Sequence, residues 1–140
     1  MAVFRTDQDD YWTHGPSWLA WIHEHSPETG IDFSMFPMAA DGEDREAPLA
    51  AMLRLPPGGV LPRHAHDCYR VEVVLHGELR SGDILLRVGD VHTSAPGEFY
   101  GPNVAGSQGC ISVEIFSRAA AVDAVYADGA DISDVRRDAT

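Results

Sequence analysis

Short apolar runs divided by turn residues are the feature that most constrains the fold of this chain. Its 13 glycines and 9 prolines fall mainly between runs such as LAAMLRL (49–55), YRVEVVL (69–75) and CISVEIF (110–116). Glycine permits positive φ and proline fixes φ, so both residues favour turns over the interiors of helices and strands. Runs of this length with a turn roughly every eight to twelve residues are typical of barrels and sandwiches. The sequence therefore predicts an all-β domain.

Net charge and hydropathy exclude two classes of partner. With a formal net charge of -12, the chain would be repelled by nucleic-acid phosphates and by anionic membrane surfaces. No apolar stretch approaches the ~20 residues of a membrane-spanning helix, and residues 1–10 lack the layout of a signal peptide. We therefore expect a cytoplasmic protein with no nucleic-acid or membrane partner. Cys68 and Cys110 are then expected to be reduced thiols rather than a disulfide.

The first 48 residues are predicted to form an N-terminal extension that packs on the barrel. They contain all three tryptophans of the chain, and the segment WLAWIHEH (18–25) is predicted to be a strand. In such a strand Trp21, His23 and His25 would share one face. Large aromatic side chains bury much area, so we expect this extension to cover the core or to form a dimer contact.

The core of the domain is predicted to span residues 49–117. Its last strand alternates strongly, which places Ile111, Val113 and Ile115 on one side. Residues 118–140 are expected to form a short helical or irregular tail. No repeat or second domain is visible, so the whole chain is predicted to be one domain.

Two histidines, His64 and His66, stand one residue apart just after a Pro-Gly turn. In a strand, residues i and i+2 point to the same face, so their imidazoles would lie close together. Two neutral imidazoles so placed can chelate one divalent ion. The alternative is that one or both only form hydrogen bonds at the mouth of a barrel. A second H-x-H at His23 and His25 shows that the pattern by itself is weak evidence.

The sequence around these histidines resembles the first motif of the cupin family. That motif runs from a glycine to an H-x-H and on to a glycine at the next turn. Here Gly58 or Gly59 begins the motif, His64 and His66 form its H-x-H, and Gly77 ends it.

The family's second motif is echoed by GDVHTSAPGEFYGPN, which runs from Gly89 to Asn103. Together the two matches cover residues 50–117. The resemblance implies a double-stranded β-helix, the jelly-roll barrel of cupins, and a homodimer, because cupins often pair. The segment SPETG (26–30) is also similar to the acetylacetone dioxygenase branch of the family.

Two ligand positions of the cupin motifs hold other residues here. Arg70 stands where the family has a glutamate, and Tyr100 stands where it has the second-motif histidine. An arginine stays protonated and cannot bind a cation. Glu72, two residues beyond Arg70 on the same face, and Asn103 are possible replacements. With the two histidines they would hold a divalent transition metal, with iron favoured by a 2-His-1-carboxylate set and Zn, Ni or Mn as alternatives.

Arg70 has three possible roles. It pairs with Glu72 inside the barrel, it binds a substrate carboxylate through its bidentate fork, or it points outward. Tyr100 either donates a hydrogen bond to a substrate or packs on the barrel rim. His92 is a possible partner of the ligand set.

Two functions of different kinds are compatible with these residues. The first is a small metal-dependent, dioxygenase-like enzyme that acts on a carbonyl or phenolic compound, with Tyr100 and Arg70 as catalytic residues. The second is a non-catalytic cupin that binds a small molecule and has a degenerate metal site. The intact H-x-H favours the enzyme, whereas the two departures favour the binding protein. We expect the enzyme, with the binding protein as the alternative. The resemblance does not choose the reaction, because cupins also include isomerases, decarboxylases and lyases.

Overall fold

Short strands and a few helical turns alternate along residues 1–131, 134 and 135, which the computed structural model describes. The helices are short, and three of the four in this part of the chain are 3-10 helices. The elements are η1 (Tyr11–Thr13), η2 (Ser17–His25), α1 (Ser26–Thr29), β1 (Asp32–Pro37), β2 (Leu49–Leu55), β3 (Val60–Leu61), β4 (His64–Ala65), β5 (Arg70–Ser81), β6 (Ile84–Arg87), β7 (Val91–Ser94), β8 (Asn103–Phe116), η3 (Ala119–Val122) and β9 (Val125–Tyr126).

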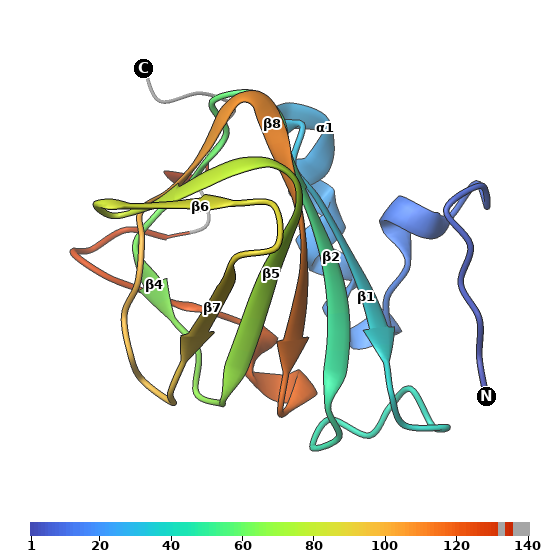
Figure 1. The fold of residues 1–140 in the computed structure, drawn as a ribbon. Helices are drawn as coiled ribbons and strands as arrows, with labels where there is room; N and C mark the ends of the chain where they lie inside the picture. The colour runs from blue at the N-terminus through green and yellow to red at the C-terminus, as the bar shows by residue number, and fades with distance from the viewer. Residues whose placement is uncertain (132–133, 136–140) are drawn as a thin grey trace.

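The main sheet is antiparallel, with the strand order β1-β2-β8-β5-β6 (Figure 1). The two longest strands, β5 and β8, lie side by side at its centre, and each has a further partner: β7 pairs with β5, and β3 pairs with β8. The register between β5 and β8 shifts at Val74/His76 and again at Gly77/Leu79. Such bulges increase the local bend and twist of a sheet, which allows it to curl into a barrel. The predicted all-β architecture is confirmed.

Gly77, the glycine that ends the first motif, lies at this bend. Its φ is +72°, a conformation that residues with a side chain rarely adopt. A Cβ at this position would also collide with the backbone carbonyl of Gly109 on β8. The motif glycine is therefore required by the close approach of the two central strands.

Alternation along the strands decides which side chains fill the interior. In β2, Leu49, Ala51, Leu53 and Leu55 are all buried, whereas the residues between them are half-buried. In β8 the buried set is different from the apolar set that the sequence suggests. Ile111, Val113 and Ile115 do share one side, as predicted, but that side is only half-buried. The buried side carries Cys110, Ser112, Glu114 and Phe116.

The predicted strand over 18–25 is wrong, because residues 17–25 form the 3-10 helix η2. Its first backbone hydrogen bond runs from Leu19 N to Pro16 O, at 3.0 Å. Leu19 is buried in the core, and Trp18 and Ile22 pack against the same cluster. Residues three and four apart share one face of a helix, so Trp18, Leu19 and Ile22 can all face the core. In a strand, Leu19 would point to the opposite face from Trp18 and Ile22. The N-terminal strand is β1, which begins at residue 32.

The first residues of the chain lie alongside β1, on the side away from β5 (Figure 1). His14 Nδ1 is 2.8 Å from Met35 O, and the Arg54 guanidinium lies 4.0 Å from the ring centroid of Trp12. Arg54 also donates to Asp32, with Nη2 2.6 Å from Oδ2. These contacts hold the N-terminal extension against the outer sheet face.

We expect Arg54→Ala to lower the free energy of unfolding by about 1 kcal/mol or less, since exposed ion pairs and cation–π contacts each contribute little. The Arg54 side chain is 42% exposed. Urea denaturation monitored by tryptophan fluorescence measures the change, with Arg80→Ala as the matched exposed control. A loss above about 2 kcal/mol would show that the extension contributes more to the core than these contacts suggest.

The C-terminal tail crosses the barrel beside the histidines. η3 follows β8 directly, and β9 then pairs with β4, so that His64 is opposite Tyr126 and Ala65 is opposite Val125. The predicted short helix at the start of the tail is therefore present as one 3-10 turn. The tail contributes to the candidate site described below.

Two sequence predictions concern the setting of the protein. None of the helices among the described residues is long and apolar enough to cross a bilayer. Cys68 and Cys110 are both buried and free, as expected for reduced thiols. The cytoplasmic location and the homodimer stay predictions.

Candidate functional site

His64 and His66 both project into the interior of the barrel. They are 7% and 6% exposed, their ring centroids lie 5.2 Å apart, and both rings line the same cavity. β4 carries His64, and the extended chain beyond it carries His66. The prediction that the two imidazoles share one interior space is confirmed.

Each imidazole is oriented by a backbone carbonyl. His64 Nδ1 is 2.6 Å from Pro62 O, and His66 Nδ1 is 2.7 Å from Ala121 O in η3. A carbonyl oxygen only accepts hydrogen bonds, so Nδ1 is the protonated nitrogen of a neutral ring and Nε2 is left as an acceptor. Each ring therefore presents one basic nitrogen whose direction the backbone fixes.

Burial keeps both rings neutral. Desolvation lowers the pKa of His64 to about 4, although the hydrogen bond to Pro62 opposes the change. Desolvation, followed by the neighbouring His64, lowers the pKa of His66 to about 3. At neutral pH both side chains are therefore uncharged acceptors.

The cavity has a volume of about 320 Å³, and its walls are mainly apolar. Aromatic side chains come from three different parts of the fold: Trp21 from η2, Phe33 from β1 and Phe116 from β8. Besides the histidines, the polar side chains that line it are Thr29, Glu114, Asp123, Tyr126 and Asp131. Several of these lie in the C-terminal tail, which thus forms part of the cavity wall.

Arg70 forms an internal ion-pair network next to the cavity. Its Nη2 donates to Glu72 Oε1 at 2.6 Å and to Glu114 Oε1 at 2.8 Å. Ser112 Oγ donates to the second oxygen of Glu72 at 2.7 Å. Glu72 and Glu114 are direct register partners on β5 and β8, so the two carboxylates meet across the central strand pair. Of the three roles open to Arg70, internal pairing with Glu72 is the one the structure contains.

The network separates the protonation of its two carboxyl groups. Burial raises the pKa of Glu114 to about 8, and the adjacent Glu72 carboxylate acts in the same direction against Arg70. Burial also opposes ionisation of Glu72, but His92, Arg70 and Ser112 together lower its pKa to about 2. Two carboxyl groups that share one cation cannot both ionise cheaply. At neutral pH the network therefore holds one carboxylate, one carboxylic acid and one guanidinium.

Tyr100 covers the guanidinium of Arg70. Its ring centroid is 4.3 Å from Arg70 Cζ and 4.6 Å from the ring of His64. Its backbone N and O each form a 3.0 Å hydrogen bond with the backbone of His64, which joins the two predicted site residues directly. The Tyr100 hydroxyl is buried and has no hydrogen-bond partner among the described residues. Tyr100 and Arg70 thus lie behind the histidines and do not line the cavity.

Glu114 is the important residue that sequence reasoning missed. It lines the cavity together with both histidines, and it completes the Arg70 network. The available signal was a charged residue in the middle of the apolar strand 110–116, on the same alternation as Ser112.

The predicted metal ligands are only partly brought together. His64 and His66 fit as two imidazole ligands, because metal-binding histidines commonly donate their other ring nitrogen to a carbonyl. The oxygens of Glu72 are bound by Arg70 and Ser112. Asn103 is 1% exposed, does not line the cavity, and its amide has no partner among the described residues.

Within residues 1–131, 134 and 135, no three His, Cys, Asp or Glu side chains are placed to hold one metal ion. As the side chains lie, the donor set does not fit the four-ligand centre that the cupin resemblance implies. The divalent metal stays a prediction.

Solved structures with a similar chain path settle the fold. A chain of the complex between Rhodobacter sphaeroides SigE and the anti-sigma ChrR matches with a TM-score of 0.54 and 19% identity over 79% of this chain. An RmlC-like cupin from Shewanella frigidimarina matches with a TM-score of 0.52 and 26% identity over 64% of this chain and 78% of its own. The chain has the cupin fold.

A third neighbour extends the range of cupins that this one resembles. Bacillus subtilis oxalate decarboxylase, described with Mn(II) centres, matches with a TM-score of 0.52 and 17% identity over 66% of this chain. This chain spans 61% of the SigE–ChrR chain and 26% of the decarboxylase chain. No family model and no curated protein matches the sequence.

Proposed function

We propose that this cupin binds a small organic molecule in the barrel cavity and orients it through His64 and His66. One observation supports this function above the others: two neutral imidazoles, each fixed by a backbone carbonyl, line a cavity whose walls are mainly apolar. Ligand sites are commonly apolar cavities with a few convergent polar groups.

The dimensions and walls of the cavity are consistent with this use. Its volume of about 320 Å³ lies at the small end of the range for ligand sites. Phe116 and Phe33 supply flat apolar surface for a ring, and the Nε2 atoms of the two histidines supply acceptors for its polar substituents. The charge of Arg70 is balanced by Glu72 and Glu114 through Nη2, whereas its Nε and Nη1 have no hydrogen-bond partner among the described residues.

Replacing the imidazole nitrogens should weaken binding more than it changes the fold. We expect His64→Phe and His66→Phe each to lower the affinity for a bound compound about tenfold, because a buried hydrogen bond contributes ~1 kcal/mol or more. Ligand-observed NMR with a set of one- and two-ring compounds identifies binders, and titration gives their affinities. His76→Phe is the matched control, because His76 is exposed and outside the cavity. Equal affinities in all four proteins would contradict a role for the histidines.

A metal-dependent, dioxygenase-like enzyme is the second candidate function. The geometry of the two imidazoles favours it, since both Nε2 atoms are free of a proton and the rings share one cavity. An open-sided centre of this kind needs a third protein ligand, which Glu72 or Glu114 would supply only after release from Arg70. We therefore place this candidate after ligand binding.

Metal analysis of protein purified without a histidine tag separates the two candidates. Ligand binding without a metal predicts well under one equivalent of Fe, Zn, Ni or Mn, even after loading with excess ion followed by dialysis. A near-stoichiometric ion that is lost in the His64→Ala, His66→Ala double variant would establish a metal centre and reverse our order. Oxygen uptake with diketones and catechols would then test the dioxygenase reaction.

A further inference from the structure

We infer that the cavity selects ligands that are uncharged or positively charged and rejects anions. This inference rests on the proposed function and adds the chemical class of the ligand. Its basis is the sign of the groups that line the cavity. None of the described residues in that lining is an arginine or a lysine, whereas the exposed aspartate Asp123 belongs to it.

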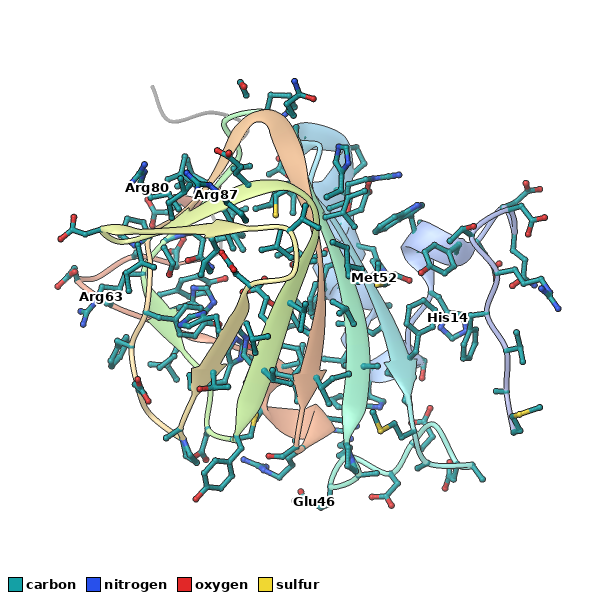
Figure 2. The ribbon with its side chains drawn as sticks, in the orientation of Figure 1. His14, Glu46, Met52, Arg63, Arg80 and Arg87 are labelled. Carbon is teal, nitrogen blue, oxygen red and sulfur yellow. The ribbon has the colours of Figure 1, made fainter. Side chains whose placement is uncertain are left out.

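The basic residues of this chain are all arginines, and the described ones are placed elsewhere. Arg54 pairs with Asp32 on the outer sheet face, and Arg118 pairs with Asp67 near the surface. Arg80 and Arg87 lie on the outside of the barrel near β6, and the exposed Arg63 lies beside the start of β4 (Figure 2).

Arg70 is the one described arginine inside the barrel, and it does not belong to the lining of the cavity. Its Nη2 is bound to Glu72 and Glu114. The remaining nitrogens, Nε and Nη1, are fully buried, and the ring of Tyr100 covers one face of the guanidinium. Arg70 is therefore not among the groups that line the cavity and meet a ligand there.

The lining offers acceptors and π faces instead of cationic donors. His64 and His66 each present an unprotonated Nε2, which accepts a hydrogen bond from an N–H or O–H group. Trp21, Phe33 and Phe116 contribute aromatic rings, whose faces attract cations and repel anions. A carboxylate that entered this cavity would lose its hydration shell and find no cationic partner among the described lining residues.

Compounds of one shape and three charges test the inference. Phenyl, naphthyl and cyclohexyl scaffolds are each prepared as the amidine, the carboxamide and the carboxylate, and the dissociation constant of each is measured by calorimetry at pH 7.5. For every scaffold that binds, we expect the amidine and the carboxamide to bind at least tenfold more tightly than the carboxylate. Tighter binding of the carboxylates would overturn the inference and leave the proposed ligand site intact. Absence of saturable binding by all nine compounds would overturn both.

A rim variant tests the electrostatic cause of the preference. Asp123→Asn is expected to reduce the preference for amidine over carboxamide by about two- to fivefold, the range for an exposed charge pair. Asp83→Asn is the matched control. Asp83 is exposed in the turn between β5 and β6, so this substitution removes the same charge outside the cavity. An equal change in both variants would mean that net charge, rather than the cavity lining, sets the preference, and would count against the inference.

Discussion

Replacing Arg70 by methionine is expected to lower the free energy of unfolding at pH 7 by about 3–5 kcal/mol, the range for breaking a buried ion pair from one side. Arg70 is 3% exposed and is the cation that both Glu72 and Glu114 contact. Because Glu114 already binds a proton at neutral pH, loss of Arg70 forces Glu72 to bind one as well. Protonating a carboxyl group of ordinary pKa at pH 7 costs about 4 kcal/mol.

Urea denaturation of a matched set of variants measures this effect. In the triple variant with Arg70→Met, Glu72→Gln and Glu114→Gln, most of the loss should be recovered, because no unpaired charge is left in the interior. The deficit of the single variant should also shrink as the pH falls towards 5. Without Arg70, the folded-state pKa of Glu72 would lie above its unfolded value, so its protonation becomes cheaper in acid. An Arg70→Met protein as stable as the wild type at pH 7 would contradict the network.

Acidification from pH 6.5 to 4.5 is expected to destabilise the protein by about 3 kcal/mol. The folded-state pKa values of His64 and His66, about 4 and about 3, lie below the ordinary imidazole pKa of 6.5. Towards the acid end of this interval, the His64 and His66 side chains bind two protons in the unfolded chain, whereas in the folded protein they stay largely unprotonated. Glu114 acts with the opposite sign, because its pKa of about 8 means that the folded state keeps one proton that the unfolded state has released. The difference of one proton, over two pH units, gives this loss.

The same linkage predicts a stability maximum near pH 6.5. Between pH 6.5 and 8 Glu114 makes the larger contribution, because the unfolded histidines release their remaining protons early in this interval, so stability should fall as the pH rises. The His64→Phe, His66→Phe double variant should reverse the acid limb and gain stability as the pH falls to 4.5. Glu114→Gln should flatten the alkaline limb. Urea midpoints at half-unit pH intervals measure both limbs, and a wild-type curve that is flat from pH 4.5 to 8 would rule out the assigned burial of these groups.

Local sequence patterns are sufficient to predict the parts of the site that come from a single segment. The spacing of His64 and His66 on an extended chain predicts that they share one space, and the structure places both rings in one cavity. The same parity predicts the Arg70–Glu72 pair, whose members are adjacent on one face of β5. Turn residues likewise predict the strand-rich core, because they act on their immediate neighbours.

Contacts between distant segments are what the sequence does not reveal. Glu114 joins Arg70 only because β5 and β8 pair in one register, and a bulge shifts that register. A shift of one residue in β8 would turn Ile115 inward in place of Glu114. The apolar side of this strand is therefore not its inner side, because the interior is partly a polar network.

The two ends of the chain show the same limit. The carbonyl of Ala121 fixes the tautomer of His66 across 55 residues of sequence. Trp21 reaches the cavity from the 3-10 helix η2, whereas the alternation of residues 18–25 predicts a strand. In both cases the packing of a terminal segment on the barrel decides the local conformation. The sequence of that segment alone does not show this packing.

Ring nitrogen chemical shifts of the histidines, recorded by ¹⁵N NMR at pH 7 on metal-free protein, give the sharpest test of the site. Two rings with a protonated Nδ1 and a bare Nε2, unchanged down to pH 5 and perturbed when a cavity ligand is added, are the result expected for His64 and His66. Imidazolium signals at pH 7, or the opposite tautomer, would mean that the two rings are not the buried, backbone-oriented acceptors on which the proposed ligand site depends.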